Sequence, residues 1–166
     1  MKMNNNDRLA RLRYALDIKD NEMVEMFKLG GLELSKTDVQ SLLQKLPSVD
    51  KENHYEKVCD NKTFELFLNG LIASKRGPAS QEWPLELNDE NANNLLLKKV
   101  KIALTLKNED MLDILDEAGV SISKSELSAV LRKEGHRNYK PCGDRYARNF
   151  LKGLAFRYRP THLTPQ

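Results

Sequence analysis

The sequence contains two copies of one pattern. Shifted by 88 residues, the chain matches itself in order, including at the less common Met and Gly: Ala15 with Ala103, Lys19 with Lys107, Met23 with Met111 and Gly31 with Gly119. After a five-residue deletion the shift becomes 83, and further identities follow: Cys59 with Cys142, Phe67 with Phe150 and Gly70 with Gly153. An internal repeat indicates that one small structural unit is built twice. We therefore expect two similar units that follow one another along the chain.

Apolar residues in both copies recur at spacings of three and four, which is the pattern of amphipathic helices. Four such segments occur in each copy. In the first copy their apolar residues are Leu9, Leu12 and Leu16; Met23, Val24, Met26 and Phe27; Val39, Leu42 and Leu43; and Phe64, Phe67, Leu68 and Leu71. In the second copy they are Leu97, Val100 and Leu104; Met111, Leu112, Ile114 and Leu115; Leu127, Val130 and Leu131; and Phe150, Leu151 and Leu154. No alternation of useful length indicates a strand. The predicted fold class is all-α, with two tandem four-helix repeats packed with pseudo-two-fold symmetry.

Glycine and serine mark the predicted helix boundaries. Gly31 and Gly119 follow the second helical segment of each copy, where a C-terminal stop is expected. Ser35 and Ser123 then stand at the N-cap positions of the third segment. Glu126 lies three residues after Ser123, which predicts a capping box in the second copy.

Gly70 and Gly153 fall inside the fourth helical segment of each copy. Glycine in a helix interior costs about 1 kcal/mol relative to alanine, so its presence in both copies indicates that another backbone passes close by. We predict that the two fourth helices touch each other, or that each touches the first helix of its own copy.

The domain boundaries follow from the repeat and from composition. We expect repeat 1 at residues 1–76, a linker at 77–94, repeat 2 at 95–160 and a frayed tail at 161–166. The linker is polar, contains two prolines and carries the single tryptophan, Trp83. A large apolar ring has little use in a free linker, so we expect Trp83 to dock on a repeat.

Several motifs resemble those of the bacterial YehS-like family, a domain of unknown function that occurs as a tandem pair. They are NDRLARLRYALDIKDNEMVEMF, FLNGLIASKRG, NNLLLKKVKIALTLKNEDML and CGDRYARNFLKGLA, in order and correctly spaced over nearly the whole chain. The resemblance implies a small cytoplasmic bacterial protein. It brings no activity, substrate or catalytic residue.

Composition is that of an ordinary globular protein, with 40% hydrophobic and 31% charged residues. No apolar run reaches the length of about 18 residues that a membrane span requires, and no secretory signal is evident at the N-terminus. Two cysteines in 166 residues do not make a disulfide framework. The expected location is the cytoplasm.

Positive charge is concentrated near the end of the chain. From Arg132 to Arg159 there are nine lysines and arginines against two acids, a net charge of +7, which leaves −4 for all other residues of a chain whose total is +3. Tyr139, Tyr146, Phe156 and Tyr158 interleave with these cations and offer rings for stacking.

The two copies also match at eight basic positions but at only three acidic ones. The basic pairs are Arg11 with Lys99, Arg13 with Lys101, Lys19 with Lys107, Lys36 with Lys124, Lys45 with Lys133, Lys57 with Lys140, Lys62 with Arg145 and Arg76 with Arg159. If charged residues served solubility alone, basic and acidic positions should match equally often between the copies. The excess of matched basic positions therefore favours a nucleic-acid-binding or regulatory accessory protein that uses a basic surface on repeat 2. The candidate contact residues are Lys36, Lys45, Lys124, Arg132, Lys133, Arg137, Lys140, Arg145, Arg148, Arg157 and Arg159.

Other interpretations stay open. A solvated basic face is the plainest. A helical adaptor for an acidic or amphipathic protein partner is the alternative function. The second and third helical segments have the length and glycine of a helix-turn-helix, but the bulky Phe27 and Leu115 stand where a small side chain would allow close crossing.

The cysteines and histidines carry a weak metal signal. His54 and His136 precede Cys59 and Cys142, which in principle allows a two-cysteine, two-histidine zinc site, yet no CxxC occurs. A buried thiol is the favoured interpretation, with redox activity as a further alternative. No phosphate-binding loop or catalytic motif is present, so we expect no enzyme activity, no cofactor and no metal.

Overall fold

The computed structural model describes residues 2–47, 50, 52–79 and 83–159. These residues form eight helices and one two-stranded hairpin: α1 (Asn5–Ala15), α2 (Asp20–Leu29), α3 (Lys36–Leu43), β1 (Lys45–Leu46), β2 (His54–Tyr55), α4 (Asn61–Arg76), α5 (Ala92–Ala103), α6 (Asn108–Glu117), α7 (Lys124–Leu131) and α8 (Asp144–Tyr158). The all-α class with two tandem four-helix repeats is confirmed. α5 begins within the stretch assigned to the linker, and the expected frayed tail lies outside the described residues.

The hairpin was not predicted. β1 and β2 pair antiparallel, with Lys45 opposite Tyr55 and Leu46 opposite His54. It lies between α3 and α4, where repeat 1 is five residues longer than repeat 2. Strands of two residues are too short to produce a period-two pattern, which is why the sequence does not reveal them.

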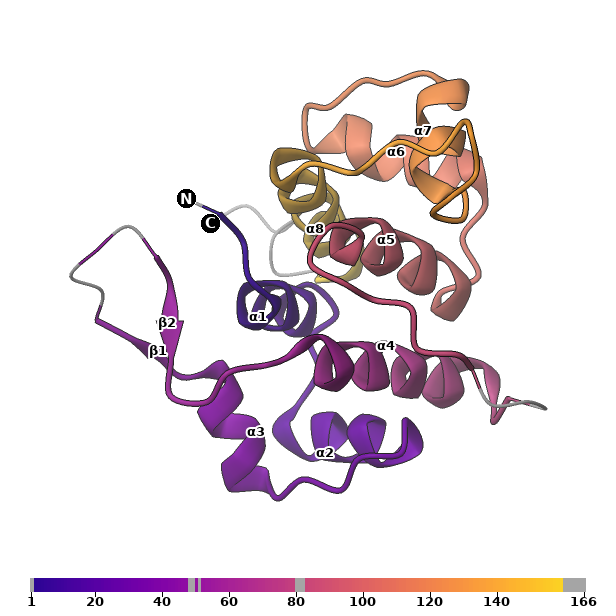
Figure 1. Ribbon diagram of the computed structural model, residues 1–166. Coiled ribbons are helices and arrows are strands. Elements are labelled where there is room, and N and C mark those ends of the chain that lie inside the picture. The colour runs from indigo at the N-terminus through magenta and orange to yellow at the C-terminus, as the bar shows by residue number, and fades with distance from the viewer. Residues whose placement is uncertain (1, 48–49, 51, 80–82, 160–166) are drawn as a thin grey trace.

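Four helices form the centre of the molecule and the other four cover it on two sides. Figure 1 shows α1, α4, α5 and α8 in the middle, with α2 and α3 on one side and α6 and α7 on the other. Within each repeat, the second helix packs against the fourth, α2 on α4 and α6 on α8. Between repeats, α4 packs against α5 and α1 packs against α8. Each first helix therefore packs against the fourth helix of the other repeat, as pseudo-two-fold symmetry requires.

The core consists of the predicted apolar stripes. Leu9, Phe27 and Phe67 are fully buried in repeat 1, and Leu97 and Phe150 are fully buried in repeat 2. The Phe27 and Phe67 ring centroids lie 5.0 Å apart in a tilted arrangement, which suits the quadrupoles of two aromatic rings. Helix packing therefore rests on large side chains contributed by all four helices of each repeat.

Gly31 and Gly119 end α2 and α6 as predicted. Their φ angles of +99° and +89° lie in the left-handed region, which glycine adopts without steric cost. The amide of Gly31 donates to the Lys28 carbonyl and the next amide donates to the Phe27 carbonyl, as in a Schellman motif.

The predicted capping box is in the other copy. In repeat 1, Ser35 Oγ accepts from the Asp38 amide, and the Asp38 carboxylate accepts from the Ser35 amide, each at 3.0 Å. In repeat 2, Ser123 Oγ accepts from the Glu126 amide, but the Glu126 carboxylate accepts from the Ser123 hydroxyl instead of its backbone amide. The reciprocal bond is therefore made by the shorter aspartate.

The prediction that another backbone passes close to Gly70 and Gly153 is right, but the predicted partner, the other fourth helix or the first helix of the same copy, is wrong. A β-carbon at Gly70 would overlap the carbonyl oxygen of Met26 in α2, and one at Gly153 would overlap the carbonyl oxygen of Ile114 in α6. The approaching backbone is thus the second helix of the same repeat. Its C-terminal turn runs against α4 or α8, and only glycine allows that distance.

Trp83 docks on repeat 2, as expected. Its ring lies 4.8 Å from the Lys99 ammonium nitrogen on α5. Among the described residues, no helix combines the length and the apolar character needed to cross a membrane.

Candidate nucleic-acid interface

Six of the eleven candidate basic residues belong to one region of repeat 2. They lie at the start of α7, on the segment joining α7 to α8, and on the first turn of α8, and all are exposed: Lys124, Arg132, Lys133, Arg137, Lys140 and Arg145. We call these six the repeat-2 basic surface. None of them forms an ion pair within 4.0 Å with any described residue. Their charges are therefore available to an external anion.

The acid within this segment is directed elsewhere. Glu134 Oε1 accepts hydrogen bonds from the side-chain amides of Asn88 and Asn91, both at 3.0 Å. Asn91 is the N-cap residue of α5. Glu134 thus attaches the basic segment to the start of α5 and makes no ion pair with its cationic neighbours in the described chain.

The tyrosines of this region are turned inward. Tyr146, together with Lys140 and Arg145, lines a hollow of 540 Å³, but its hydroxyl oxygen is buried and has no hydrogen-bond partner among the described residues. Tyr139 is in the same situation, and burial raises the pKa of both hydroxyls. The surface therefore presents charge more than it presents open rings.

The other five candidates lie elsewhere. Lys36 is the first residue of α3, at the opposite end of the molecule from α7 (Figure 1). Arg157 pairs with Asp110 at 3.2 Å. Lys45 lines a groove between α1 and α8, and Arg148 is half-buried on α8. The eleven residues do not form one continuous surface.

Arg159 and its counterpart Arg76 hold the two repeats together. Arg159 Nη1 donates to the Tyr14 carbonyl and to Asp17 Oδ1, both at 3.0 Å, and its guanidinium lies 4.2 Å from the Tyr14 ring centroid. In the equivalent place, Arg76 Nη1 contacts the Ile102 carbonyl and donates to Thr105 Oγ1. Each arginine caps the end of the first helix in the other repeat. The match between Arg76 and Arg159 is therefore explained by their contacts within the fold.

The sequence interpretation missed two asparagines at matching positions of the repeats, Asn6 and Asn94. Asn6 donates its amide to the carbonyls of Leu42 and Lys57 and accepts from the Cys59 amide. Asn94 does the same for the carbonyls of Val130 and Lys140 and the amide of Cys142. The signal that reveals them is an identical polar residue at the shift of 88, three residues before a buried leucine.

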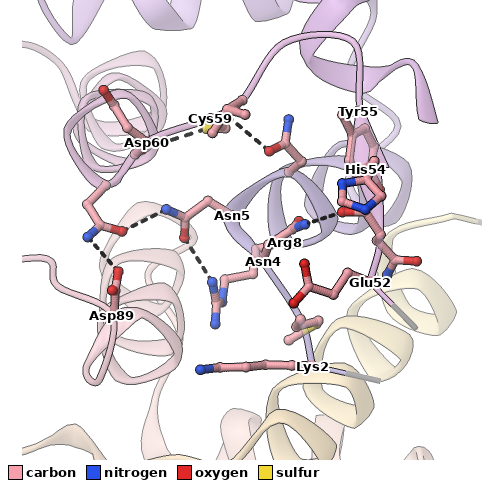
Figure 2. A pocket seen from close by; sticks show the side chains of 15 residues that line it. Lys2, Asn4, Asn5, Arg8, Glu52, His54, Tyr55, Cys59, Asp60 and Asp89 are labelled. Atoms are coloured by element: carbon pink, nitrogen blue, oxygen red, sulfur yellow. Dashed lines mark hydrogen bonds between the residues drawn. The ribbon is translucent and has the colours of Figure 1, made fainter. Parts of the chain in front are cut away.

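A polar cavity of 540 Å³ lies where the N-terminal ends of α1 and α4 meet, and Figure 2 shows it from close by. The guanidinium of Arg8 points toward Asn5, and Asn5 is linked through Asn61 to Asp89. Lys2 and Arg8 face three acids here: Glu52, Asp60 and Asp89. This mixed charge does not favour a polyanion.

Arg8 connects the repeats at the back of this cavity. Its side chain is 7% exposed, and it donates to Asn93 Oδ1 and Asn5 Oδ1, each at 2.8 Å. Its third nitrogen lies 3.8 Å from Asp144 Oδ1. The residue at the equivalent position in repeat 2 is the apolar Leu96, which cannot make these polar contacts. Arg8 therefore has no symmetric counterpart at the interface between the repeats.

The two cysteines are buried, unpaired thiols. Burial raises the pKa of Cys59 and of Cys142 to about 12, with Asp60 and Asp144 adding to the effect, and this keeps both protonated at neutral pH. In the described chain, no group of three or more His, Cys, Asp or Glu side chains is placed to hold a metal. His54 contacts Asp50.

Comparison with known proteins identifies the family and no activity. The chain is 37% identical over 155 residues to the uncharacterized protein YehS of Escherichia coli (strain K12), covering 93% of this chain and 96% of that protein. No solved structure matches the chain at a significant level. The family model described as a protein of unknown function, DUF1456, matches residues 5–77 and again residues 93–159. The chain therefore belongs to the DUF1456 family, with one family unit in each of its two helical repeats.

Proposed function

We propose that this chain is a cytoplasmic binding protein, not an enzyme, whose repeat-2 basic surface contacts the phosphates of a nucleic acid. The observation that carries the proposal is the set of six exposed lysines and arginines without an ion-pair partner in the described chain. Neutralising phosphates releases condensed counterions, which favours binding without reading the base sequence. The inward hydroxyls of Tyr139 and Tyr146 favour contacts to the backbone over stacking of bases.

Binding to labelled nucleic acids across a salt series tests the proposal. Fluorescence anisotropy would be measured with single-stranded RNA, single-stranded DNA and duplex DNA of about 20 nucleotides, from about 50 to 300 mM KCl. We expect affinity to fall steeply with salt. The triple variant K133E/R137E/R145E should bind at least about tenfold more weakly and show a shallower salt dependence, by about 0.7–0.9 for each phosphate that the variant no longer neutralises.

A matched variant separates this surface from total charge. K28E/K62E/K75E makes the same change in net charge on exposed residues of repeat 1. We expect it to weaken binding by less than about threefold. Equal losses in the two variants, or no binding of any of the three nucleic acids at about 50 mM KCl, would contradict the proposal.

The alternative function is a protein-interaction adaptor. It is favoured by a separate observation, a hollow of 430 Å³ lined by α1, the hairpin and α8, which lies outside the repeat-2 basic surface.

A further inference from the structure

A hollow of 540 Å³ opens in repeat 2 between the loop that follows α6, the helix α7 and the start of α8. Two exposed cations, Lys140 and Arg145, line it together with an apolar wall that includes Val120, Ile122 and Pro141. We call it the α7–α8 hollow. A concave site that joins an apolar wall to a few charged groups is the usual form of a small-ligand site.

The cations of this hollow are unpaired, whereas repeat 1 pairs one of theirs. Lys57, which matches Lys140, lies 3.5 Å from the carboxylate of Asp38. Glu126 matches Asp38, but its carboxylate accepts from the Ser123 hydroxyl at 3.3 Å. Among the described residues, neither cation of the hollow has an ion pair within 4.0 Å.

Repeat 2 has also lost two acids at matching positions. Glu33 of repeat 1 is replaced by Ser121, and Asp60 is replaced by Gly143, and both replacements line the hollow. The two cations are kept in both copies. They face three acids at the matching positions of repeat 1 and one acid, Glu126, in repeat 2. The duplicated unit has therefore changed from an excess of negative charge here to an excess of positive charge.

The lost aspartate also leaves the start of α8 without a side-chain cap. In repeat 1, the Asp60 carboxylate accepts from the Thr63 amide in the first turn of α4 at 2.7 Å. Gly143 makes no such bond, and a β-carbon there would meet no atom within 4 Å. The start of a helix favours an anion, because its first amides have no partner within the helix. An external anion beside Lys140 and Arg145 therefore takes the place of the missing carboxylate.

The hollow also borders an unsatisfied hydroxyl. Tyr146 is among its lining residues, and its hydroxyl oxygen is buried and has no hydrogen-bond partner among the described residues. The matching residue of repeat 1 is Thr63. A buried polar group without a partner costs free energy, so a ligand oxygen that accepts from this hydroxyl would add to the stability of a complex.

We propose that the α7–α8 hollow binds a nucleoside 5′-phosphate group, with the phosphate on Lys140, Arg145 and the first-turn amides of α8, and the base against the apolar wall. A terminal phosphate carries nearly two negative charges at neutral pH, which matches two unpaired cations. Arginine also suits phosphate because its planar fork donates two parallel hydrogen bonds. The half-buried Val120 and Ile122 suit the face of a base better than they suit a polyhydroxylated sugar.

Isotope-labelled protein titrated with adenosine 5′-monophosphate tests the site directly. We expect a Kd of about 0.1–1 mM at about 50 mM salt, with shifts of the backbone amide signals of Gly119, Gly143 and Arg145. Adenosine and inorganic phosphate should each bind at least about threefold more weakly, since each lacks half of the ligand. A Kd above about 10 mM, shifts confined to other parts of the chain, or equal affinity for adenosine or inorganic phosphate would overturn the proposal.

The variant Gly143→Asp rebuilds the acid that repeat 1 has at this place. It should fold, because aspartate is a better N-cap residue than glycine and the added β-carbon meets no atom within 4 Å. We expect it to weaken binding of the nucleotide at least about tenfold. Asn138→Asp makes the same change in net charge on an exposed residue of the same segment outside the hollow, and should weaken binding less than about threefold. Equal losses in the two variants would contradict the proposal.

Two sources carry this ligand chemistry, a free nucleotide and the 5′ end of a strand, and the second rests on the proposed function. RNA with a 5′-phosphate and RNA with a 5′-hydroxyl, both labelled at the 3′ end, would be compared by fluorescence anisotropy. Binding of the phosphorylated strand at least about threefold more tightly, with the preference lost in Gly143→Asp, identifies the strand end as the ligand. Binding of the free nucleotide without this preference identifies the nucleotide.

The same measurements separate this proposal from the proposed function. If 5′-hydroxyl RNA binds with the expected salt dependence but neither source is recognised, the hollow proposal fails and the repeat-2 basic surface stands. If the free nucleotide binds in the hollow and no nucleic acid binds, the hollow proposal stands and the proposed function fails.

Discussion

At the scale of single residues, the helices of each repeat approach one another through two glycines. The carbonyl oxygens of Met26 and Ile114 lie where β-carbons of Gly70 and Gly153 would stand. The cost of glycine in the interior of a helix is about 1 kcal/mol each, and the structure offsets it with close packing of α2 on α4 and of α6 on α8. The repeated FL-x-GL motif is therefore a packing signature.

Alanine at these glycines should destabilise the protein. We expect Gly70→Ala and Gly153→Ala each to lower the free energy of unfolding by about 1–3 kcal/mol, because the added methyl group forces a backbone shift that outweighs the gain in helix propensity. Urea unfolding followed by circular dichroism measures the change. Gly143→Ala, whose added methyl meets no atom within 4 Å, is the control and should cost less than about 1 kcal/mol. Stabilisation by either helix substitution would contradict the packing explanation.

At the scale of elements, the repeats are joined by exchange of helix partners and by two arginines. α1 packs on α8 and α5 packs on α4, and the ends of α1 and α5 receive Arg159 and Arg76. The backbone turns sharply just after these helix ends, where Asp17 and Thr105 have positive φ angles of 53° and 54°. A positively charged group near a helix C-terminus is favoured by the helix dipole, so each arginine stabilises a strained turn of the other repeat.

Removing Arg159, the C-cap residue of α8, should cost more than removing Arg157 in the last turn of that helix. We expect Arg159→Ala to lower the free energy of unfolding by about 1–2 kcal/mol, through loss of the carbonyl contact, the Asp17 pair and the Tyr14 stacking. Arg157→Ala breaks an exposed pair with Asp110 and should cost less than about 1 kcal/mol. Thermal and urea unfolding of both variants measure the difference. Equal costs would mean that Arg159 has no special part in joining the repeats.

At the scale of the whole molecule, a polar network crosses the centre between the repeats. Asp144 on α8 accepts from the Met3 amide of repeat 1 and from the Asn93 side chain of α5, both at 2.9 Å. Burial alone would raise the pKa of Asp144. The bonds from Asn93 and Met3, with the charges of Arg8 and Arg148, outweigh burial, and the pKa lies below its ordinary value of 3.8. Asp144 therefore stabilises the fold in its charged form.

This network predicts a pH dependence. Because the pKa of Asp144 is lower in the folded than in the unfolded chain, its contribution is complete above pH 3.8 and is lost as pH falls through the folded value. We expect Asp144→Asn to destabilise the protein by about 1–2 kcal/mol at about pH 7, and the difference from wild type to shrink progressively as the pH falls below 3.8. Urea unfolding at several pH values measures it. Exposed Asp113→Asn is the control, and a pH-independent difference for Asp144→Asn would contradict the assignment.

The helices and the repeat were predictable because they depend on short-range patterns. Leu9, Leu12 and Leu16 mark one face of α1 whatever it packs against, and Gly31 ends α2 through its own backbone freedom. The repeat is visible because matching residues keep their order along the chain. The hairpin is an exception, because its strands, which pair Lys45 with Tyr55, have only two residues each and are too short to show an alternating pattern of apolar and polar residues.

The candidate basic surface was predictable only in part. Arg132, Lys133 and Arg137 are exposed, as their place in a charged segment indicates. Arg159, in the same charged stretch, is instead held by the carbonyl of Tyr14, 145 residues earlier in the chain. No local pattern distinguishes a free arginine from one with a distant partner, because that partner is brought near only by folding.

The sequence by itself determined the class of fold, the duplication and the excess of positive charge in the second copy, since each follows from composition or from the spacing of neighbouring residues. The tertiary structure alone decided that each first helix packs on the other repeat's fourth helix, and that Trp83 lies over Lys99 where α4 and α5 meet, while Arg148 of α8 stands at the position of Glu65. The physical reason is that a groove exists only where distant helices meet. Its charge has a meaning only once the facing residues are known.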